Sequence, residues 1–316
     1  MLVRDVLWRP YEPSDAPALA ELMNTIEEHA GGHASYTAEE LQSLIATLVR
    51  DLASDSSMLF APDGTLVAAG FTTTPPDGGF KVYLTGGVHP RWRGNGLGRQ
   101  ILDRHLSRAV EIHRELGRGA EWVAEAPRVP IGDREAGRLF ARFGLAPVRY
   151  WFEMVAPTAQ VPVAATPEGL RIVDYAPRYD AAVHAAHMEA FADTWEFQQR
   201  DRESWLAITT RSPSFLPELS LLAFDGHVLI GYLLTYSHPD PCRVYVGELG
   251  VRRPWRQRGL ASALLAGALD AAARAGVKEV SLSVDAGSPT GAVGVYERAG
   301  FTIESSTVTH SIPLTG

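Results

Sequence analysis

Hydrophobic and polar positions follow two periodicities along the chain, and the same order of periodicities occurs in each half. Apolar residues three or four positions apart predict helices, as in 97–116, where Ile101, Leu102 and Leu106 share one face. Short apolar runs between turn residues predict strands. In the first half we expect strand 6–11, helices 14–28 and from 37 onward, strands 57–61, 65–74 and 82–88, helix 97–116, strand 121–126, helix 134–143 and strand 148–155.

The second half repeats this order. Its predicted elements are strand 170–175, helices 179–191 and 203–210, strands 219–224, 228–236 and 244–251, helix 260–275, strand 278–284, helix 290–299 and strand 308–312. Each half therefore has helices, then an antiparallel hairpin meander, then a helix that crosses to a further strand. The fold class expected for each half is α+β.

A loop rich in arginine and glycine follows a predicted strand in each half. Residues 88–98 and 251–261 both fit V-x3-W-R-x2-G-L-[GA], about half of the 316 residues apart. So long a period excludes a solenoid and indicates two duplicated domains of about 150 residues each. We expect domains at 1–156 and 169–316, joined by a proline-spaced, semi-rigid linker at 157–168.

Composition narrows the class of protein. The hydrophobic content of 46% is that of a globular chain, and no apolar run approaches the about 20 residues that span a bilayer. The first residues lack a signal-peptide pattern, and Cys242 is the single cysteine, so a reducing cytoplasm is expected. The net charge of −8 is shared by both halves, which argues against general nucleic-acid binding.

A glycine-rich loop between a strand and a helix is suited to binding an anion. Glycines allow left-handed backbone angles, and successive N–H groups with the following helix N-terminus can point at an anion. Neighbouring arginines suit phosphate pairing; they are Arg91, Arg93, Arg252, Arg253, Arg256 and Arg258. The loops predict a pyrophosphate site, although a surface turn without a ligand is the alternative for either loop taken alone.

Two known phosphate loops are excluded. There is no G-K-[ST], so neither copy is a Walker P-loop, and Arg99 occupies the third glycine position of a dinucleotide fingerprint.

The chain resembles the tandem members of the GNAT (Gcn5-related N-acetyltransferase) family. The resemblance covers both halves and is carried by [QR]-x-x-G-x-[GA] loops at 93–98 and 256–261, and by 292–301, which is similar to A-x-x-[LV]-Y-x-x-x-G-F. It implies two tandem GNAT-like domains, each a mixed, mostly antiparallel sheet flanked by helices. It also implies direct acetyl transfer from acetyl-CoA, used as cosubstrate without a metal, to a primary amine of a small molecule.

The resemblance assigns the cofactor-binding residues. In its members the strand before the loop diverges from its neighbour at a bulge and pairs with the pantetheine arm, while the loop binds the pyrophosphate. Ser288 and Pro289 stand where the family has an asparagine that binds CoA. The residues expected to bind acetyl-CoA are Val88, Arg93, Gly94, Asn95, Gly96, Leu97, Gly98, Leu249, Val251, Arg256, Gln257, Arg258, Gly259, Leu260, Ala261 and Ser288.

Acetyl transfer to an amine needs a base, donors for the oxyanion and an acid for the departing thiolate. In the second half Glu248 is the candidate base, the Val251 N–H the donor and Tyr296 the acid. In many family members the carboxylate is earlier, where this chain has Tyr245. The first half has Thr85 and Phe140 at the corresponding positions. We therefore expect catalysis in the second half, and in the first half a structural acetyl-CoA site or only a partner domain.

Each candidate has a structural alternative. Glu248 could be a solvated strand residue, and Tyr296 could pack in the core with its hydroxyl at the rim. His184 and His187 are three positions apart on one helix, but without a third ligand an exposed or capping role is favoured over metal binding. Four aromatic residues could line the acceptor site or belong to the core: Trp195, Phe197, Trp205 and Tyr236.

Two other functions stay open at this point. The chain could be a non-catalytic acyl-CoA-binding sensor or partner module, or it could acylate a protein lysine or N-terminus. The acidic balance faintly favours a cationic amine as acceptor. We expect a monomer with internal pseudo-symmetry, because tandem family members can bury the face through which single-domain members dimerise.

Overall fold

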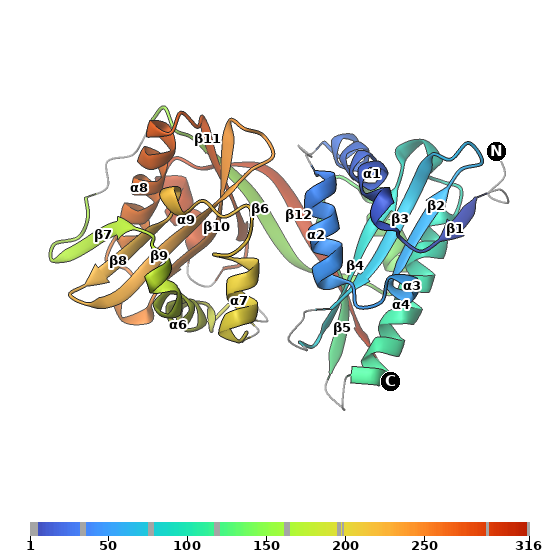
Figure 1. Ribbon diagram of the computed structural model, residues 1–316, viewed down its shortest axis with the longest axis horizontal. Coiled ribbons are helices and arrows are strands. Elements are labelled where there is room, and N and C mark those ends of the chain that lie inside the picture. Colours follow the sequence, from blue (N-terminus) through green and yellow to red (C-terminus); the bar gives the residue numbers. More distant parts are fainter. Residues whose placement is uncertain are drawn as a thin grey trace. The chain divides into compact units, whose positions relative to one another are not determined.

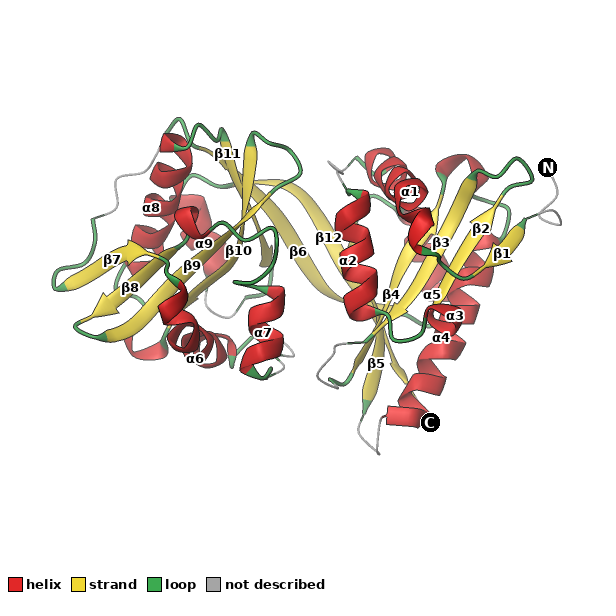
Figure 2. Ribbon diagram, viewed as in Figure 1, coloured by secondary structure: helices red, strands yellow, loops and turns green. Residues whose placement is uncertain are grey.

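The computed structural model describes residues 6–31, 36–74, 79–116, 121–160, 165–194, 197, 199–288 and 291–314. The chain divides into two compact units (Figure 1). The first unit is Met1–Tyr150 together with Thr307–Gly316, and the second is Trp151–Ser306. Both are α+β, with a mixed, mostly antiparallel sheet flanked by helices, which confirms the predicted fold class (Figure 2).

The first unit has the sheet order β1-β2-β3-β4-β5-β12. Neighbouring strands are antiparallel except β4 and β5, which are parallel. Its elements are β1 (Leu7–Arg9), α1 (Ala16–His29), α2 (Ala38–Leu48), α3 (Leu52–Asp55), β2 (Ser56–Phe60), β3 (Leu66–Thr73), β4 (Lys81–Val88), α4 (Leu97–Leu116), β5 (Trp122–Pro130), α5 (Arg134–Arg142), the start of β6 (Ala146–Pro157) and the end of β12 (Thr302–Leu314).

The second unit repeats the arrangement with the order β6-β11-β10-β9-β8-β7. Its one parallel pair is β10 and β11, at the same place in the sheet. Besides the remainder of β6 and the start of β12, its elements are β7 (Leu170–Asp174), α6 (Asp180–Phe191), α7 (Arg202–Ile208), β8 (Leu221–Asp225), β9 (Val228–Ser237), β10 (Arg243–Val251), α8 (Leu260–Arg274), β11 (Glu279–Asp285) and α9 (Ala292–Arg298).

The sixth strand of each sheet comes from a distant part of the sequence. In the first unit, Thr307–Leu314 of β12 pairs with β5, and in the second unit Trp151–Pro157 of β6 pairs with β11. The predicted strands 148–155 and 308–312 exist, but neither closes the half of the sequence to which it was assigned. The expected linker 157–168 begins within β6 and falls inside the second unit, and its residues 161–164 lie outside the described part of the chain.

Two hydrophobic cores sandwich each sheet. In the second unit α6 and α7 cover one face around Trp205, Leu222 and Tyr232, and α8 and α9 cover the other around Leu264 and Phe301. The first unit is built the same way, with α1 and α2 on one face and α4 on the other.

Most predicted helix boundaries are close to those observed. Gly144, Gly276 and Gly300 end helices with φ of 82°, 81° and 90°, as left-handed C-terminal glycines do. The first helix is an exception: a short 3-10 turn precedes it, so α1 begins at Ala16 and Ser14 is not its N-cap.

Within the described residues, no helix combines the length and apolarity that a membrane crossing needs. The same part of the chain holds no group of three histidine, cysteine or carboxylate side chains that could bind a metal ion.

Candidate active site

The site of the second unit begins where two parallel strands separate. β10 pairs with β11 only from Arg243 to Val246, whereas its pairing with β9 continues to Val251. A bulge interrupts the register with β9 between Val246 and Glu248. Both the bulge and the divergence of the strands agree with the sequence-based expectation. The divergence leaves the last residues of β10 without a strand partner on the β11 side among the described residues.

The bulge places two glycines against two tyrosine rings of β9. A Cβ on Gly247 would be 2.5 Å from Cε2 of Tyr236, and a Cβ on Gly250 would be 2.4 Å from Cε1 of Tyr232. Such distances are too short for any side chain, so glycine is required at both positions. The two rings therefore lie on either side of Glu248, on the sheet face covered by α6 and α7.

Glu248 has a strongly perturbed carboxyl group. Its side chain is 23% exposed, and burial raises its pKa to about 8, opposed by the nearby positive charge of Arg200. One carboxyl oxygen is 3.5 Å from Nδ1 of His187, which projects from α6. A carboxyl with a pKa near neutrality can exchange a proton under ordinary conditions. Glu248 is therefore partly buried rather than fully solvated, and its role as the base stays a prediction.

His187 is surrounded by aromatic rings, so an exposed role for it is wrong. Its ring stacks on Phe191 at 4.5 Å, and the rings of Trp205 and Phe197 are 5.1 Å and 6.2 Å away. Nδ1 is 2.7 Å from the hydroxyl of Tyr232, and burial lowers the pKa of His187 to about 3. His187 is therefore neutral at physiological pH.

The remaining aromatic and histidine candidates lie at different places relative to Glu248. Tyr236 lies beside the bulge, and burial raises the pKa of its phenol. His184 has its Nε2 2.9 Å from the carbonyl oxygen of Arg200, so it contacts the segment that leads into α7. Trp195 lies outside the described residues.

Tyr296 lies on α9, next to the core, with its ring at an edge-on contact of 6.0 Å with Phe301. Burial raises the pKa of its phenol to about 12, with further contributions from Tyr245 and Glu248. Tyr296 therefore keeps its proton at neutral pH and lies within electrostatic reach of Glu248. Packing against the core and a role as proton donor are compatible for this residue.

The loop of the second unit has the backbone of an anion site. Gly259 and Gln257 have φ of 79° and 61°, and α8 starts at Leu260, whose side chain is buried. Among the described residues, no side chain caps the N-terminus of α8. The first N–H groups of a helix have no partner within the helix, so those of Leu260 and Ala261 are available to a ligand. Ser288 lies in the turn after β11, where its N–H donates to the carbonyl of Asp285.

Three arginines near this loop contact carboxylates, although the sequence predicts phosphate pairing for them. Arg252 is 2.6 Å from Glu189, and Arg253 forms an ion pair with Asp193. Arg256 donates to the carbonyl oxygens of Val251 at 3.1 Å and of Ala190 at 2.7 Å, and it also contacts Asp193. These contacts fasten the loop to the end of α6. Arg258 is exposed and has no hydrogen bond or ion pair within the described residues.

The loop of the first unit has the same backbone form. Gly94 and Gly96 have φ of 77° and 84°, and α4 follows from Leu97. The side-chain amide of Asn95 donates to the carbonyl oxygens of Trp92 and Arg93, at 3.2 Å and 3.3 Å.

Contacts of Arg93 and Gly98 hold this first loop against its surroundings. Arg93 reaches the carbonyl oxygen of Val88 at 3.5 Å and Asp133 at 3.2 Å. A Cβ on Gly98 would be 3.3 Å from Leu139, so α4 and α5 approach closely at the start of α4.

The catalytic candidates have no counterpart in the first unit. Thr85 is exposed on β4, which pairs with β3 to Val88 without a register shift, so there is no bulge. Phe140 packs against His310 with ring centres 5.0 Å apart. The first unit therefore has a loop of the same form, but its residues at the positions of the candidate base and acid, Thr85 and Phe140, cannot exchange protons in the same way.

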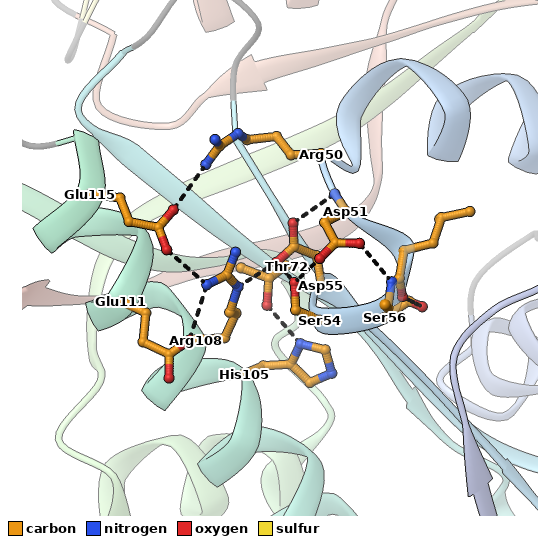
Figure 3. Close-up of polar contacts among 12 residues, drawn as sticks. Arg50, Asp51, Ser54, Asp55, Ser56, Thr72, His105, Arg108, Glu111 and Glu115 are labelled. Atoms are coloured by element: carbon orange, nitrogen blue, oxygen red, sulfur yellow. Dashed lines mark hydrogen bonds and ion pairs between the residues drawn. The ribbon is translucent and has the colours of Figure 1, made fainter.

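A buried polar cluster in the first unit explains how α4 is held (Figure 3). Arg108 of α4 is 2.6 Å from Asp55, a fully buried carboxylate in α3, and also contacts Glu111 and Glu115. His105 is 2.6 Å from the hydroxyl of Thr72. Every one of these groups has a partner within the protein, so the cluster acts as a structural clamp beneath the helix that starts at the first loop.

In the second unit two parallel strands thus separate in front of a glycine-containing loop, with a partly buried carboxylate beside the gap. The family model "Acetyltransferase (GNAT) family" matches residues 181–301, most of the second unit. The chain is 31% identical to a mycothiol acetyltransferase from Pseudarthrobacter chlorophenolicus, over 87% of this chain and 85% of that protein. A mycothiol acetyltransferase from Thermobispora bispora is 32% identical over 68% and 70%.

Comparison with solved structures supports the same family. A GCN5-related N-acetyltransferase from Sphaerobacter thermophilus has a TM-score of 0.84 and 31% identity, covering 100% of this chain and 98% of that one. A tandem GNAT protein from the clavulanic acid biosynthesis pathway has a TM-score of 0.72 at 16% identity, covering 99% of both, which shows a shared fold. The chain belongs to the acetyltransferase (GNAT) family. It is an acyltransferase with two tandem units of that fold.

Proposed function

We propose that the second unit transfers an acetyl group from acetyl-CoA directly to a primary amine of a small molecule. The observation that carries the proposal is the position of Glu248, at the bulge where β10 separates from β11, with its carboxyl pKa raised to about 8. A base for amine acetylation works best with a pKa near the operating pH.

Each catalytic side chain has a defined task in this proposal. Glu248 accepts a proton from the ammonium group, and the freed amine attacks the thioester carbonyl, forming a C–N bond. The N–H of Val251 stabilises the oxyanion. When the C–S bond breaks, Tyr296 protonates the departing thiolate, because its phenol retains its proton at neutral pH. The attacking nitrogen loses its second proton as the amide forms, and a proton returns to the phenolate to restore Tyr296.

The two loops hold the cosubstrate in this proposal. The N–H groups at the start of α8 and the guanidinium of Arg258 bind the pyrophosphate, and the unpaired edge of β10 binds the pantetheine amides. The loop from Arg93 to Gly98 binds a second acetyl-CoA without catalysing transfer, because Thr85 and Phe140 replace the base and the acid.

The acceptor is proposed from the relatives. Since the curated relatives are named mycothiol acetyltransferases, we propose mycothiol lacking its acetyl group as the first acceptor to assay. We further propose that the protein works as a cytoplasmic monomer, in keeping with its single exposed cysteine, Cys242.

Calorimetric titration with acetyl-CoA tests the cosubstrate directly. Two sites per chain would support binding by both loops, and one site would restrict binding to one unit. No binding at millimolar acetyl-CoA would overturn the proposal. Turnover with the acceptor then separates an enzyme from a non-catalytic acyl-CoA sensor, which would bind acetyl-CoA without consuming it.

A further inference from the structure

We infer that His187 is a positioning residue for Glu248: Tyr232 fixes the tautomer of His187, and the imidazole in turn sets the basicity and orientation of the carboxyl group. This inference rests on the proposed function, in which Glu248 is the base. It assigns catalytic importance to an α6 histidine and a β9 tyrosine that are not themselves expected to touch the reacting atoms.

The geometry joins three elements at one nitrogen atom. Nδ1 of His187, on α6, is 2.7 Å from the Tyr232 hydroxyl on β9 and 3.5 Å from a carboxyl oxygen of Glu248 on β10. Stacking on Phe191 and contact with Trp205 fix the plane of the imidazole. Gly250, opposite Tyr232 in the strand pairing, leaves the space that the Tyr232 ring occupies.

The direction of the first hydrogen bond follows from burial. Tyr232 is fully buried, its phenol keeps its proton, and Nδ1 of His187 is its one hydrogen-bond partner among the described residues. A buried O–H without an acceptor is costly, so the phenol must donate to Nδ1. Neutral His187 therefore carries its own proton on Nε2.

That tautomer determines whether His187 can donate a proton to the carboxyl group of Glu248. The in-plane lone pair of Nδ1 is already used, so His187 offers the carboxylate no proton and presents an electron-rich atom to it. The other titratable or charged groups near Glu248 are Arg200 before α7, Tyr236 on β9, Tyr245 on β10 and Tyr296 on α9. Of these only Arg200 favours ionisation. His187 thus helps to maintain Glu248 as a strong base.

The tautomer is measurable without any assay of activity. Nitrogen-15 NMR of the full chain at pH 7 should show His187 protonated at Nε2. In Tyr232→Phe the ring still fills the space over Gly250 but donates nothing, so the proton should move to Nδ1, where it can be donated to Glu248. A wild-type His187 that is charged or protonated at Nδ1, or a Tyr232→Phe variant with an unchanged tautomer, overturns the inference.

The pH dependence of kcat/KM provides the second readout. Tyr232→Phe lets Nδ1 of His187 carry a proton that it can donate to the carboxylate, so the acidic limb should move to lower pH by about one unit, with a lower plateau. His187→Phe offers no donor to the carboxylate, so it should not move the limb to lower pH. His227→Phe, in the exposed turn between β8 and β9, is the control and should leave the limb in place. A limb unmoved in Tyr232→Phe, with only a lower rate, would mean a merely structural role.

The two levels of the argument fail differently. If wild-type protein acetylates no amine, the proposed function fails while the NMR result still stands. If it acetylates the amine but neither the tautomer nor the acidic limb responds to Tyr232→Phe, the inference about His187 fails and the proposed function survives.

Discussion

The ring of Tyr232 lies directly across the backbone of Gly250, its partner on the neighbouring strand, at a distance that leaves no room for a Cβ atom. This relationship fixes the hydroxyl of Tyr232 beside His187 and so defines one wall around Glu248. We expect Gly250→Ala to displace the ring and to destabilise the protein by about 1–3 kcal/mol, as overpacking does. Urea denaturation and kcat measured on the same sample check both effects.

Gly132→Ala is the matched control for that substitution. No atom lies within 4 Å of a Cβ built on Gly132, and its backbone is not left-handed. Stability and kcat should both be unchanged. Equal losses in the two variants would contradict the proposed importance of the Tyr232–Gly250 contact.

Glu248→Gln should reduce kcat by about 10²–10⁴-fold, because the side chain keeps its shape but no longer accepts a proton. In the wild-type protein kcat/KM should increase with pH until the carboxyl group is ionised, with an apparent pKa of about 8. The variant should lack that dependence. A pH–rate profile recorded with saturating acetyl-CoA tests this, and an unaltered profile in the variant would remove Glu248 as the base.

Glu248→Gln, which should lower kcat, should increase the stability of the folded protein at pH 8. Because the folded-state pKa of Glu248 is raised above its ordinary value of 4.5, the folded protein holds a proton that the unfolded chain has released. Stability is therefore lost as pH increases from about 4.5 to about 8. Glu248→Gln removes this loss, so the Tm of the variant should exceed that of the wild type at pH 8. Equal Tm differences at pH 4 and pH 8 would contradict the buried-carboxyl interpretation.

Tyr296→Phe removes one hydroxyl and leaves the ring packed against Phe301. We expect kcat to fall by about 10²-fold if Tyr296 is the acid, while the Kd for acetyl-CoA stays nearly constant. Calorimetry and steady-state kinetics together separate the two quantities. Tyr150→Phe, which removes the hydroxyl of an exposed tyrosine in the first unit, is the control.

Two arginines of the second loop should respond differently to substitution. Arg258 is exposed and has no partner among the described residues, so Arg258→Ala should weaken acetyl-CoA binding several-fold, more at low salt, without changing Tm. Arg256 bonds to Val251, Ala190 and Asp193, so Arg256→Ala should lower Tm as well. Calorimetric Kd values at two salt concentrations and thermal melts distinguish them. Identical behaviour would refute separate ligand and scaffold roles.

Much of the fold could be predicted from local patterns. Hydrophobic periodicity and turn residues located nearly all helices and strands, because each depends on neighbouring residues. The partner of a strand depends on the whole sheet, so periodicity could not show that β12 pairs with β5 or that β6 pairs with β11. The bulge before Glu248 came from the family resemblance, not from the residues themselves.

The electrostatic surroundings of the site could not be predicted from local sequence patterns. The carboxylates that bind Arg252, Arg253 and Arg256 lie near the end of α6, about 60 residues earlier in the sequence. The sequence indicates His187 only as half of a possible metal pair with His184. Its contact with Tyr232 depends on the closeness of α6 to β9, which the pattern of neither segment reveals. Gly250 lies directly opposite Tyr232 in the pairing of β10 with β9, but the register that brings them together follows a bulge that local patterns do not reveal.

The exchanged strands make completion of the first unit depend on a segment made long after the rest of its sheet. Thr307–Leu314 supplies the sixth strand of a sheet whose other five strands are made before residue 131. During synthesis the nascent first unit has β5 as an open edge until residues 307–314 emerge, and open edges invite pairing with other chains. A fragment ending at residue 150 should therefore aggregate, and a peptide of residues 302–316 supplied in trans should rescue it.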